Sequence, residues 1–253
     1  MIRRSIGIAL LGAMGTALLL RAAPAPAAVS RSRNDVDRIV ALWAAATGGL
    51  DRIRALAAVR MTGTIAFGGG APNPFTVEVA RPGRIRTRVT FPQGDWLQVY
   101  DGKRGWVVSP FAKSPAAVPM TPEELANAPE QADIEGPLVD SAKKGIALAL
   151  EGKEQVQGRD AWKIRVTRPD GVIRYLDLDA ATSLKMRWKG ELGAGADKKM
   201  NASLFSDYRK VSGLSFPFRI VSGIAGEAPA QEIVFEKIEV NPAILPSAFE
   251  VPK

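Results

Sequence analysis

Hydrophobic and polar residues alternate with a period of two along most of this chain, which is typical of β-strands with one buried face. In the clearest run, residues 84–91, Ile85 and Val89 fall on one face and three arginines fall on the other. Turn residues separate the runs at intervals of about 8–12 residues, as in a sandwich or a barrel. The pattern therefore predicts a mainly β protein whose sheet has one covered face and one face in water.

We expect these runs to form one curved sheet, an open (incomplete) antiparallel β-barrel of about eleven strands with short helices covering its concave face. The runs that predict strands are 59–67, 75–81, 84–91, 96–100, 105–108, 146–157, 161–168, 172–178, 184–189, 201–209, 216–222 and 232–240.

The pair Asp101-Gly102 lies between two short hydrophobic runs, Trp96–Tyr100 and Gly105–Val108. Asp-Gly in this setting is a strong hairpin signal, because the tight turn it favours needs a positive φ at both central positions. The two runs also carry two of the chain's five tryptophans. We therefore expect this hairpin to border an apolar hollow inside the curved sheet.

Two stretches have helical rather than alternating patterns. The first helix should begin with Asn34 as its N-cap and end before Gly48-Gly49, with a short helical turn following at 50–57. The second stretch is a helical insert at about 112–146, in which Thr121–Glu124 has the sequence of a capping box. We expect helices at 125–132 and 137–144 of this insert. The insert could be a mobile lid over the hollow or a static layer of the core, and the sequence leaves both readings open.

The first 27 residues have the pattern of a cleaved signal peptide. Arg3 and Arg4 form a basic start, residues 6–20 are hydrophobic, and Ala25–Ala27 has the small-x-small pattern of a cleavage site. The hydrophobic run is short for a membrane span. We therefore expect residues 28–253 to form a single domain in a bacterial periplasm, after export across the inner membrane.

The chain contains no Cys and no His, which excludes several kinds of chemistry. Disulfides, thiol nucleophiles, His general bases and Ser-His-Asp triads are ruled out, and the commonest zinc ligands are absent. We expect neither a metal nor another cofactor. After removal of residues 1–27, 31 basic residues stand against 26 acidic ones, a net charge of +5. These charges are dispersed rather than clustered, so a nucleic acid is a poor candidate partner.

Carboxylate chemistry stays open. Asp101, Asp177 and Asp207 lie at or near the ends of expected strands. Two carboxylates about 5–10 Å apart in an open cleft would indicate a hydrolase of an envelope glycan or ester. Aspartate at the end of a strand is more often part of a turn, which makes the enzyme the less favoured alternative.

Several motifs also resemble those of a known family. They are Tyr100-Asp101-Gly102 before Gly105-Trp106, Phe205–Arg209 before Gly213-Leu214 and Phe216-Pro217, and Ile238–Pro242 before Phe249 and Pro252. Together they resemble the LolA/LolB-like outer-membrane lipoprotein-sorting proteins over most of the chain after the signal. The resemblance implies a half-barrel whose concave side is covered by helices and lined with apolar side chains. In characterised members of that family the hollow accepts or senses the acyl chains of lipoproteins.

Alternation along the expected strands supplies candidate lining residues for such a hollow. Each buried CH₂ group contributes about 0.8 kcal/mol, so an apolar groove can hold an acyl chain, although the same residues also suit an ordinary core. The candidate ligand contacts are Met61, Ile65, Ile85, Val89, Trp96, Trp106, Met186 and Trp188.

We therefore expect a monomeric periplasmic binding protein that carries or senses lipid or lipoprotein acyl chains without catalysis. A partner protein at the inner or outer membrane is compatible with this function. The main alternative is an interaction module that presents the basic sheet face of Arg84, Arg86 and Arg88 to a protein or a membrane surface.

Overall fold

The computed structural model describes residues 27–114, 116–192 and 199–252, and the expected signal peptide therefore lies almost wholly outside the described residues. The described chain forms one antiparallel sheet of 13 strands. This confirms the expected open barrel, with two strands more than expected. The strands are β1 (Ala58–Phe67), β2 (Asn73–Ala80), β3 (Arg84–Phe91), β4 (Gly94–Tyr100), β5 (Gly105–Val108), β6 (Val118–Pro119), β7 (Ala147–Val156), β8 (Arg159–Thr167), β9 (Ile173–Asp179), β10 (Lys185–Leu192), β11 (Lys199–Val211), β12 (Leu214–Ile224) and β13 (Gln231–Val240).

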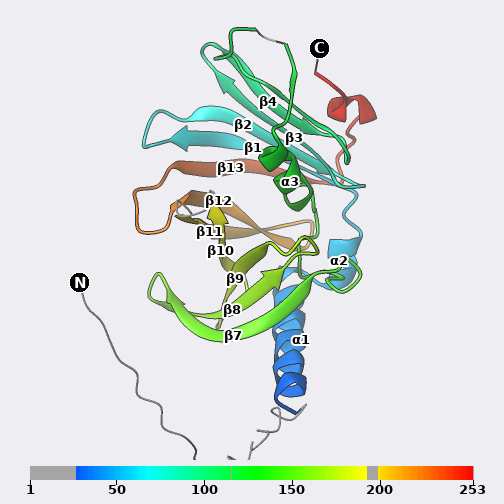
Figure 1. The fold of residues 1–253 in the computed structure, drawn as a ribbon, viewed down its shortest axis with the longest axis vertical. Helices are drawn as coiled ribbons and strands as arrows, with labels where there is room; N and C mark the ends of the chain where they lie inside the picture. The colour runs from blue at the N-terminus through cyan, green and yellow to red at the C-terminus, as the bar shows by residue number, and fades with distance from the viewer. Residues whose placement is uncertain (1–26, 115, 193–198, 253) are drawn as a thin grey trace, which may run out of the picture.

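The strand order explains how the sheet is built. Strands β1 to β6 run outward from the middle of the sheet, and β7 to β13 return from the opposite edge to the middle, where β13 pairs with β1. The two edge strands, β6 and β7, do not pair within the described residues, so the barrel is not closed there. The segment 120–146 connects these two edges, and it therefore has to cross the open side of the barrel (Figure 1).

Three helices accompany the sheet: α1 (Ala27–Thr47), α2 (Leu50–Arg54) and α3 (Pro122–Gln131). Helix α1 crosses the lower strands near their ends in Figure 1 and buries Ile39 against the inner face of β8 and β9. It ends as predicted, with the amide of Gly48, at φ 125°, donating to the carbonyl of Ala44 at 3.1 Å. The predicted start at Asn34 is wrong. Nothing between Ala27 and Asn34 breaks a helix, because the intervening residues include neither Gly nor Pro.

The insert contains the predicted capping box. The amide of Glu124 donates to Thr121 Oγ1 at 3.3 Å, and the amide of Thr121 donates to Glu124 Oε2 at 2.7 Å. The helix predicted at 137–144 is wrong, because this stretch forms a series of turns. Asp140 has a φ of 50°, in the left-handed region, which interrupts a right-handed helix at its centre.

The hairpin at Asp101 also differs in detail from the prediction. Only Gly102, with φ 102°, has a positive φ between β4 and β5. Asp101 instead accepts the backbone amides of Lys103 and Arg104 at its Oδ1 atom, at 2.8 and 2.7 Å. This Asx-type bonding supplies the turn that a second left-handed residue would have supplied.

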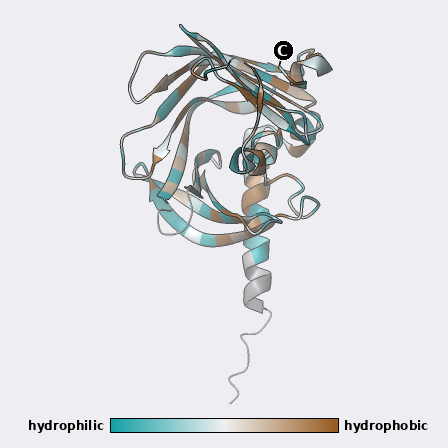
Figure 2. Cartoon of the chain, turned by 45° about the horizontal axis from the view of Figure 1, so that its top comes forward, coloured by the Kyte–Doolittle hydropathy of each residue, from teal (hydrophilic) through white to brown (hydrophobic). Residues whose placement is uncertain are grey.

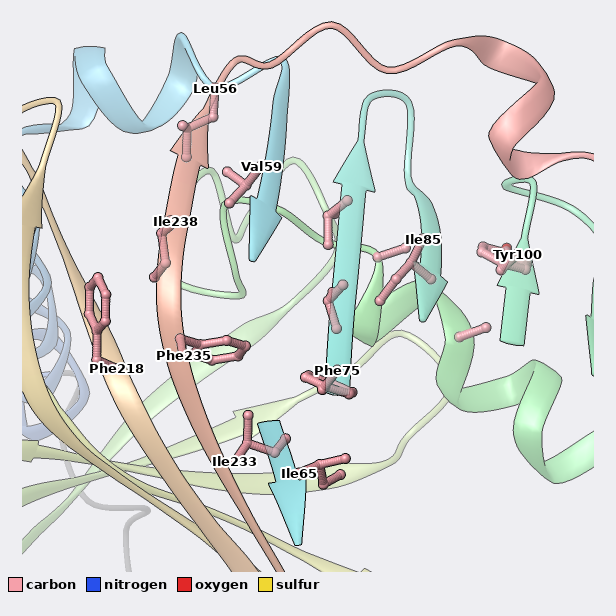
Figure 3. Packing of buried hydrophobic residues seen from close by; sticks show 14 of the residues in the cluster. Leu56, Val59, Ile65, Phe75, Ile85, Tyr100, Phe218, Ile233, Phe235 and Ile238 are labelled. Carbon is pink, nitrogen blue, oxygen red and sulfur yellow. The ribbon is translucent and has the colours of Figure 1, made fainter. Parts of the chain in front are cut away.

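The hydrophobic core is divided between the two halves of the sheet. One cluster lies on the inner face of β1–β4, β12 and β13 and includes Phe75, Phe218 and Phe235 (Figure 3). A second cluster lies between α1 and the inner face of β8 and β9. Trp43 of α1 packs against both clusters and so links them. Brown hydrophobic segments alternate with teal ones along the curled strands in Figure 2, as the period of two requires.

The outer face of the sheet carries a third, smaller cluster. The C-terminal 3₁₀ helix η2 (Pro246–Phe249) places Phe249 against Ala58, Ala80 and Val99. Arg84 lies over the Phe249 ring, with 5.0 Å between the guanidinium carbon and the ring centroid. The tail therefore covers part of the face that alternation alone predicts to be in water.

Candidate functional site

Two adjoining cavities lie on the inner side of the sheet, where the insert crosses the open barrel. The first has a volume of about 600 Å³ and lies between the β2–β3 turn, the insert and the β8–β9 hairpin. The second has a volume of about 360 Å³ and lies between α1, α2, the insert and the inner face of β9–β12. Both volumes are in the range of sites for small organic ligands.

A single wall separates the two cavities. The six residues that line both of them are Glu130, Asp133, Ile134, Glu135, Pro137 and Trp188. Five of the six belong to the insert, and Trp188 belongs to β10. We call the insert part of this boundary, residues 130–137, the dividing wall. Any ligand longer than one cavity would have to displace or thread past the dividing wall.

Glu130 at the end of α3 ties the dividing wall to the sheet. Its carboxylate accepts from Arg168 Nη1 at 3.0 Å and from the indole Nε1 of Trp188 at 3.0 Å, and Arg174 Nε lies 3.4 Å away. The side chains of Arg168 and Arg174 are only 15% and 14% exposed, so these contacts are shielded from solvent. This hydrogen bond holds the Trp188 indole at the boundary of both cavities.

A second set of ion pairs holds the middle of the dividing wall. Lys144 Nζ donates to the two carboxylate oxygens of Asp133 at 2.8 and 2.6 Å and to the carbonyl of Gly136 at 2.9 Å. Glu135 lies 3.5 Å from Lys144 and also pairs with Arg81 from the β2–β3 turn. Ion pairs thus hold the dividing wall together with apolar packing, because Ala132 is buried in the inner-face cluster and Ile134 packs against it.

Apolar groups dominate the space that these ion pairs leave free. The first cavity is bordered by Ile134, Ile146, Val166 and Trp188, and the second by Trp43, Leu176 and Phe205. The acidic residues on the dividing wall are all paired with cations, so they present little unsatisfied charge to a ligand. The arrangement suits an elongated apolar molecule with few polar groups.

The candidate ligand contacts from the sequence lie in three different places. Met61, Ile65, Ile85, Val89 and Trp96 all lie in the inner-face cluster of the β1–β4 half, where they pack against one another rather than line either cavity. As ligand contacts they remain a prediction.

Of the other three candidates, Trp188 lines both cavities, whereas Met186 and Trp106 lie on the outer face. Trp106 pairs with Val99, which belongs to the outer-face cluster. Met186 lies at an irregularity between Lys185 and Arg187 in the β9–β10 register and packs in an outer-face cluster with Ala161. A β-bulge reverses the facing of the residues beyond it, which simple alternation does not anticipate.

Residues 130–137 fall within the insert predicted at about 112–146, but none of them was among the predicted ligand contacts. A recognisable signal exists in the composition of this part of the insert, because acidic residues recur at 130, 133 and 135 of the dividing wall and at 140 beyond it, and each of them pairs with a cation. Their partners, such as Arg54 and Arg168, lie far away in the chain, so the pairing could not be read from spacing.

The three aspartates considered for hydrolysis each have a structural role. Asp101 caps its turn, and Asp207 accepts from Arg209 at 3.0 and 2.6 Å. Asp177 is fully buried on the outer face, where it accepts from Arg187 at 2.7 Å. Burial raises the pKa of Asp177, against the opposing effect of Arg187.

The arginine row of β3 is likewise engaged within the protein. Arg86 lies 3.4 Å from Glu78, and Arg88 lies 3.4 Å from Asp95 on the neighbouring strand. Arg84 lies over Phe249, as described above. The outer face at β3 therefore has much of its positive charge balanced by its own neighbours.

Within the described part of the chain, no group of acidic side chains could hold a metal ion. None of the helices in that part of the chain has the length and apolar character needed to cross a membrane.

Solved structures with this fold include two that align over nearly their full length. A DUF1329 family protein from Desulfovibrio piger has a TM-score of 0.57 at 14% identity, covering 85% of this chain and 97% of its own. An outer membrane lipoprotein-sorting protein domain from Vibrio parahaemolyticus has a TM-score of 0.56 at 11% identity, covering 84% of this chain and 94% of its own. No protein-family model and no curated protein sequence matches the chain. The chain is therefore similar in fold to these two proteins.

Proposed function

We propose that this protein is a periplasmic carrier or sensor that binds the acyl chain of a lipid or lipoprotein inside its open barrel, without catalysing a reaction. The observation that carries the proposal is the pair of adjoining, largely apolar cavities of about 600 and 360 Å³, which are separated by the ion-paired dividing wall. The similarity in fold to a lipoprotein-sorting domain supports the same ligand class.

The energetics favour an acyl chain over a compact ligand. A chain that buries about eight CH₂ groups would gain about 6 kcal/mol from transfer out of water. Chain ordering and any opening of the dividing wall reduce this gain, so we expect a dissociation constant between about 40 μM and about 1 mM. Such an affinity suits a protein that must release its ligand as well as bind it.

The first test is native mass spectrometry of the mature protein isolated gently from a periplasm. We expect a population that is heavier by one lipid or lipopeptide and that loses this mass in detergent. A second test is displacement of the uncharged dye Nile red by 1-dodecanol, which needs no charged group on the ligand. A protein with no added mass that binds neither molecule would overturn the proposal.

A matched pair of variants tests whether the ligand binds in these cavities. Ile134→Trp adds volume on the dividing wall, where it borders both cavities, and should weaken dodecanol binding at least about tenfold. Val234→Trp adds the same group at a 39% exposed position of β13 and should leave binding unchanged. Equal affinities in the two variants would exclude the cavities as the binding site.

A further inference from the structure

Lys185, the first residue of β10, occupies an unusual position at the inner end of the site. It lines the second cavity and also a third one of about 270 Å³ that adjoins it. Leu184, Phe205 and Tyr208 line the same two cavities, so the four residues form the boundary between them. Lys185 Nζ lies 3.8 Å from the centroid of the Phe205 ring, which packs the lysine against an aromatic face.

The charge of Lys185 has no anionic partner among the described residues. The acidic residues on the boundary of the second cavity are paired elsewhere, with Lys144, Arg81 and Arg168. Those bordering the third cavity are paired too, Asp179 with Arg159 and Asp207 with Arg209. Lys185 thus lies where two cavities meet, and the carboxylates that line these cavities pair with cations other than Lys185.

The nearby tyrosine does not compete for this charge. Tyr208 donates its hydroxyl hydrogen to the backbone carbonyl of Lys185 at 2.8 Å. Burial raises the pKa of Tyr208 and lowers that of Lys185 to about 8. At neutral pH the tyrosine is therefore neutral, while most of the lysine still carries a proton. An anion that entered the boundary would meet a partly desolvated ammonium group, where a charge pair is stronger than in water.

We propose that Lys185 binds the anionic head group of the acyl ligand, a carboxylate or a phosphate, while the chain lies in the second cavity. This inference rests on the proposed function and makes it more specific: the protein selects single-chain anionic amphiphiles over neutral ones. The third cavity adjoins the second at Lys185 and offers the head group or its substituent about 270 Å³ of space.

The test compares ligands that share a chain and differ in head group. Displacement of Nile red is measured with dodecanoate, dodecyl phosphate and 1-dodecanol. We expect one or both anions to bind at least about tenfold more tightly than the alcohol, the size of one charge-assisted hydrogen bond. The better of the two anions identifies the head group as a carboxylate or a phosphate.

Three variants then locate the effect. Lys185→Met keeps an unbranched stem on Phe205 and removes the charge, so it should abolish the preference for the anion, measured within the variant as the ratio of anion to dodecanol affinity. Lys185→Arg should retain most of the preference. Lys153→Met is the control, because Lys153 also lies over an aromatic ring, 4.4 Å from that of Trp162, but lines none of the three cavities. Thermal unfolding of each variant confirms that it is folded.

The outcomes separate this inference from the proposed function. Equal affinity for anions and alcohol in the unaltered protein, or a preference that survives in Lys185→Met, would overturn the role of Lys185 and leave an acyl-binding protein. Failure of all three ligands to displace the dye would overturn the proposed function and this inference with it.

Discussion

Replacing Lys144 with methionine should loosen the middle of the dividing wall. Lys144 is the residue on which the middle of the dividing wall depends, since it makes three hydrogen bonds of 2.6–2.9 Å to Asp133 and Gly136. Methionine keeps the length and much of the volume of the lysine stem but donates no hydrogen bond. The variant therefore removes the attachment with little change in packing.

The expected loss of stability follows from these contacts. A hydrogen bond to a charged group contributes about 1.5–3 kcal/mol. The side chains of Lys144 and Asp133 are 26% and 23% exposed, so water can replace part of what is lost. Glu135 keeps Arg81 as a partner after the substitution. We therefore expect the free energy of unfolding to fall by about 2 kcal/mol, less than the sum of three separate bonds.

Two measurements check this expectation. Urea denaturation gives the change in unfolding free energy, and hydrogen exchange reports whether the loss is local. We expect faster exchange at the amides of Gly136 and Lys144, which are bonded within the insert, and little change at amides of β8 and β9. Because the dividing wall borders both cavities, the association of an acyl ligand should also become faster.

The neighbouring lysine provides the control. Lys143 is 81% exposed and lies 3.5 Å from Asp140, so Lys143→Met should change stability by less than about 0.5 kcal/mol. If Lys144→Met were as stable as Lys143→Met and showed the same exchange, the ion pairs would not hold the dividing wall, and the reasoning would be refuted. Unchanged ligand association in a destabilised variant would instead favour a static layer over a lid.

Three further predictions concern other parts of the structure. Ile164→Ala, at a fully buried position under α1, should lower the unfolding free energy by about 2–5 kcal/mol in urea titrations, and a loss below about 1 kcal/mol would mean that this cluster is not a core. Thr121→Ala removes the N-cap of α3 and should lower the free energy of unfolding by about 1 kcal/mol, with faster amide exchange confined to the insert. Faster exchange elsewhere would contradict a local role of this cap. Lys189→Met should lower the free energy of unfolding by about 2 kcal/mol at pH 7. Burial alone would raise the pKa of Glu154, and the hydrogen bond from Lys189 helps to lower this pKa from 4.5 to about 2. The lowered pKa of Glu154 stabilises the fold above pH 4.5, and this contribution is lost as the pH falls towards 2. The difference in unfolding free energy between the variant and the unaltered protein should therefore shrink in acid. A difference that does not depend on pH would contradict this role of Lys189.

Local signals in the sequence were sufficient for most of the secondary structure. The bounds of β3 and β5 agree with the hydrophobic alternation, and the capping box at Thr121 begins α3 where expected. These features depend on residues that are close in the chain, so tertiary context seldom overrides them. The helix expected at 137–144 failed for the complementary reason: its side chains bond to distant groups, as Asp140 does to Arg54.

It was harder to predict from the sequence on which face of the sheet each side chain lies. Alternation places Ile85 and Val89 correctly on the inner face, because β3 runs without a bulge between β2 and β4. It does not place Met186, which follows Lys185 at a register shift. A bulge places two residues of one strand opposite one residue of its partner, so it is a property of the pairing of two strands rather than of one strand.

The sequence by itself determined that the chain forms a curved antiparallel sheet, that its inner face is apolar, and that His- or Cys-based chemistry is excluded. Only the tertiary structure decided where the free space lies. The dividing wall and Trp188 are more than fifty residues apart in the chain, and Lys185 and Phe205 meet only because β10 pairs with β11. A cavity is bounded by segments that come together from distant parts of the chain. A charged side chain is left without an ion-pair partner only when the nearby groups of opposite charge pair with other residues. Neither property is present in any local stretch of residues, whereas the period of two is present in every strand.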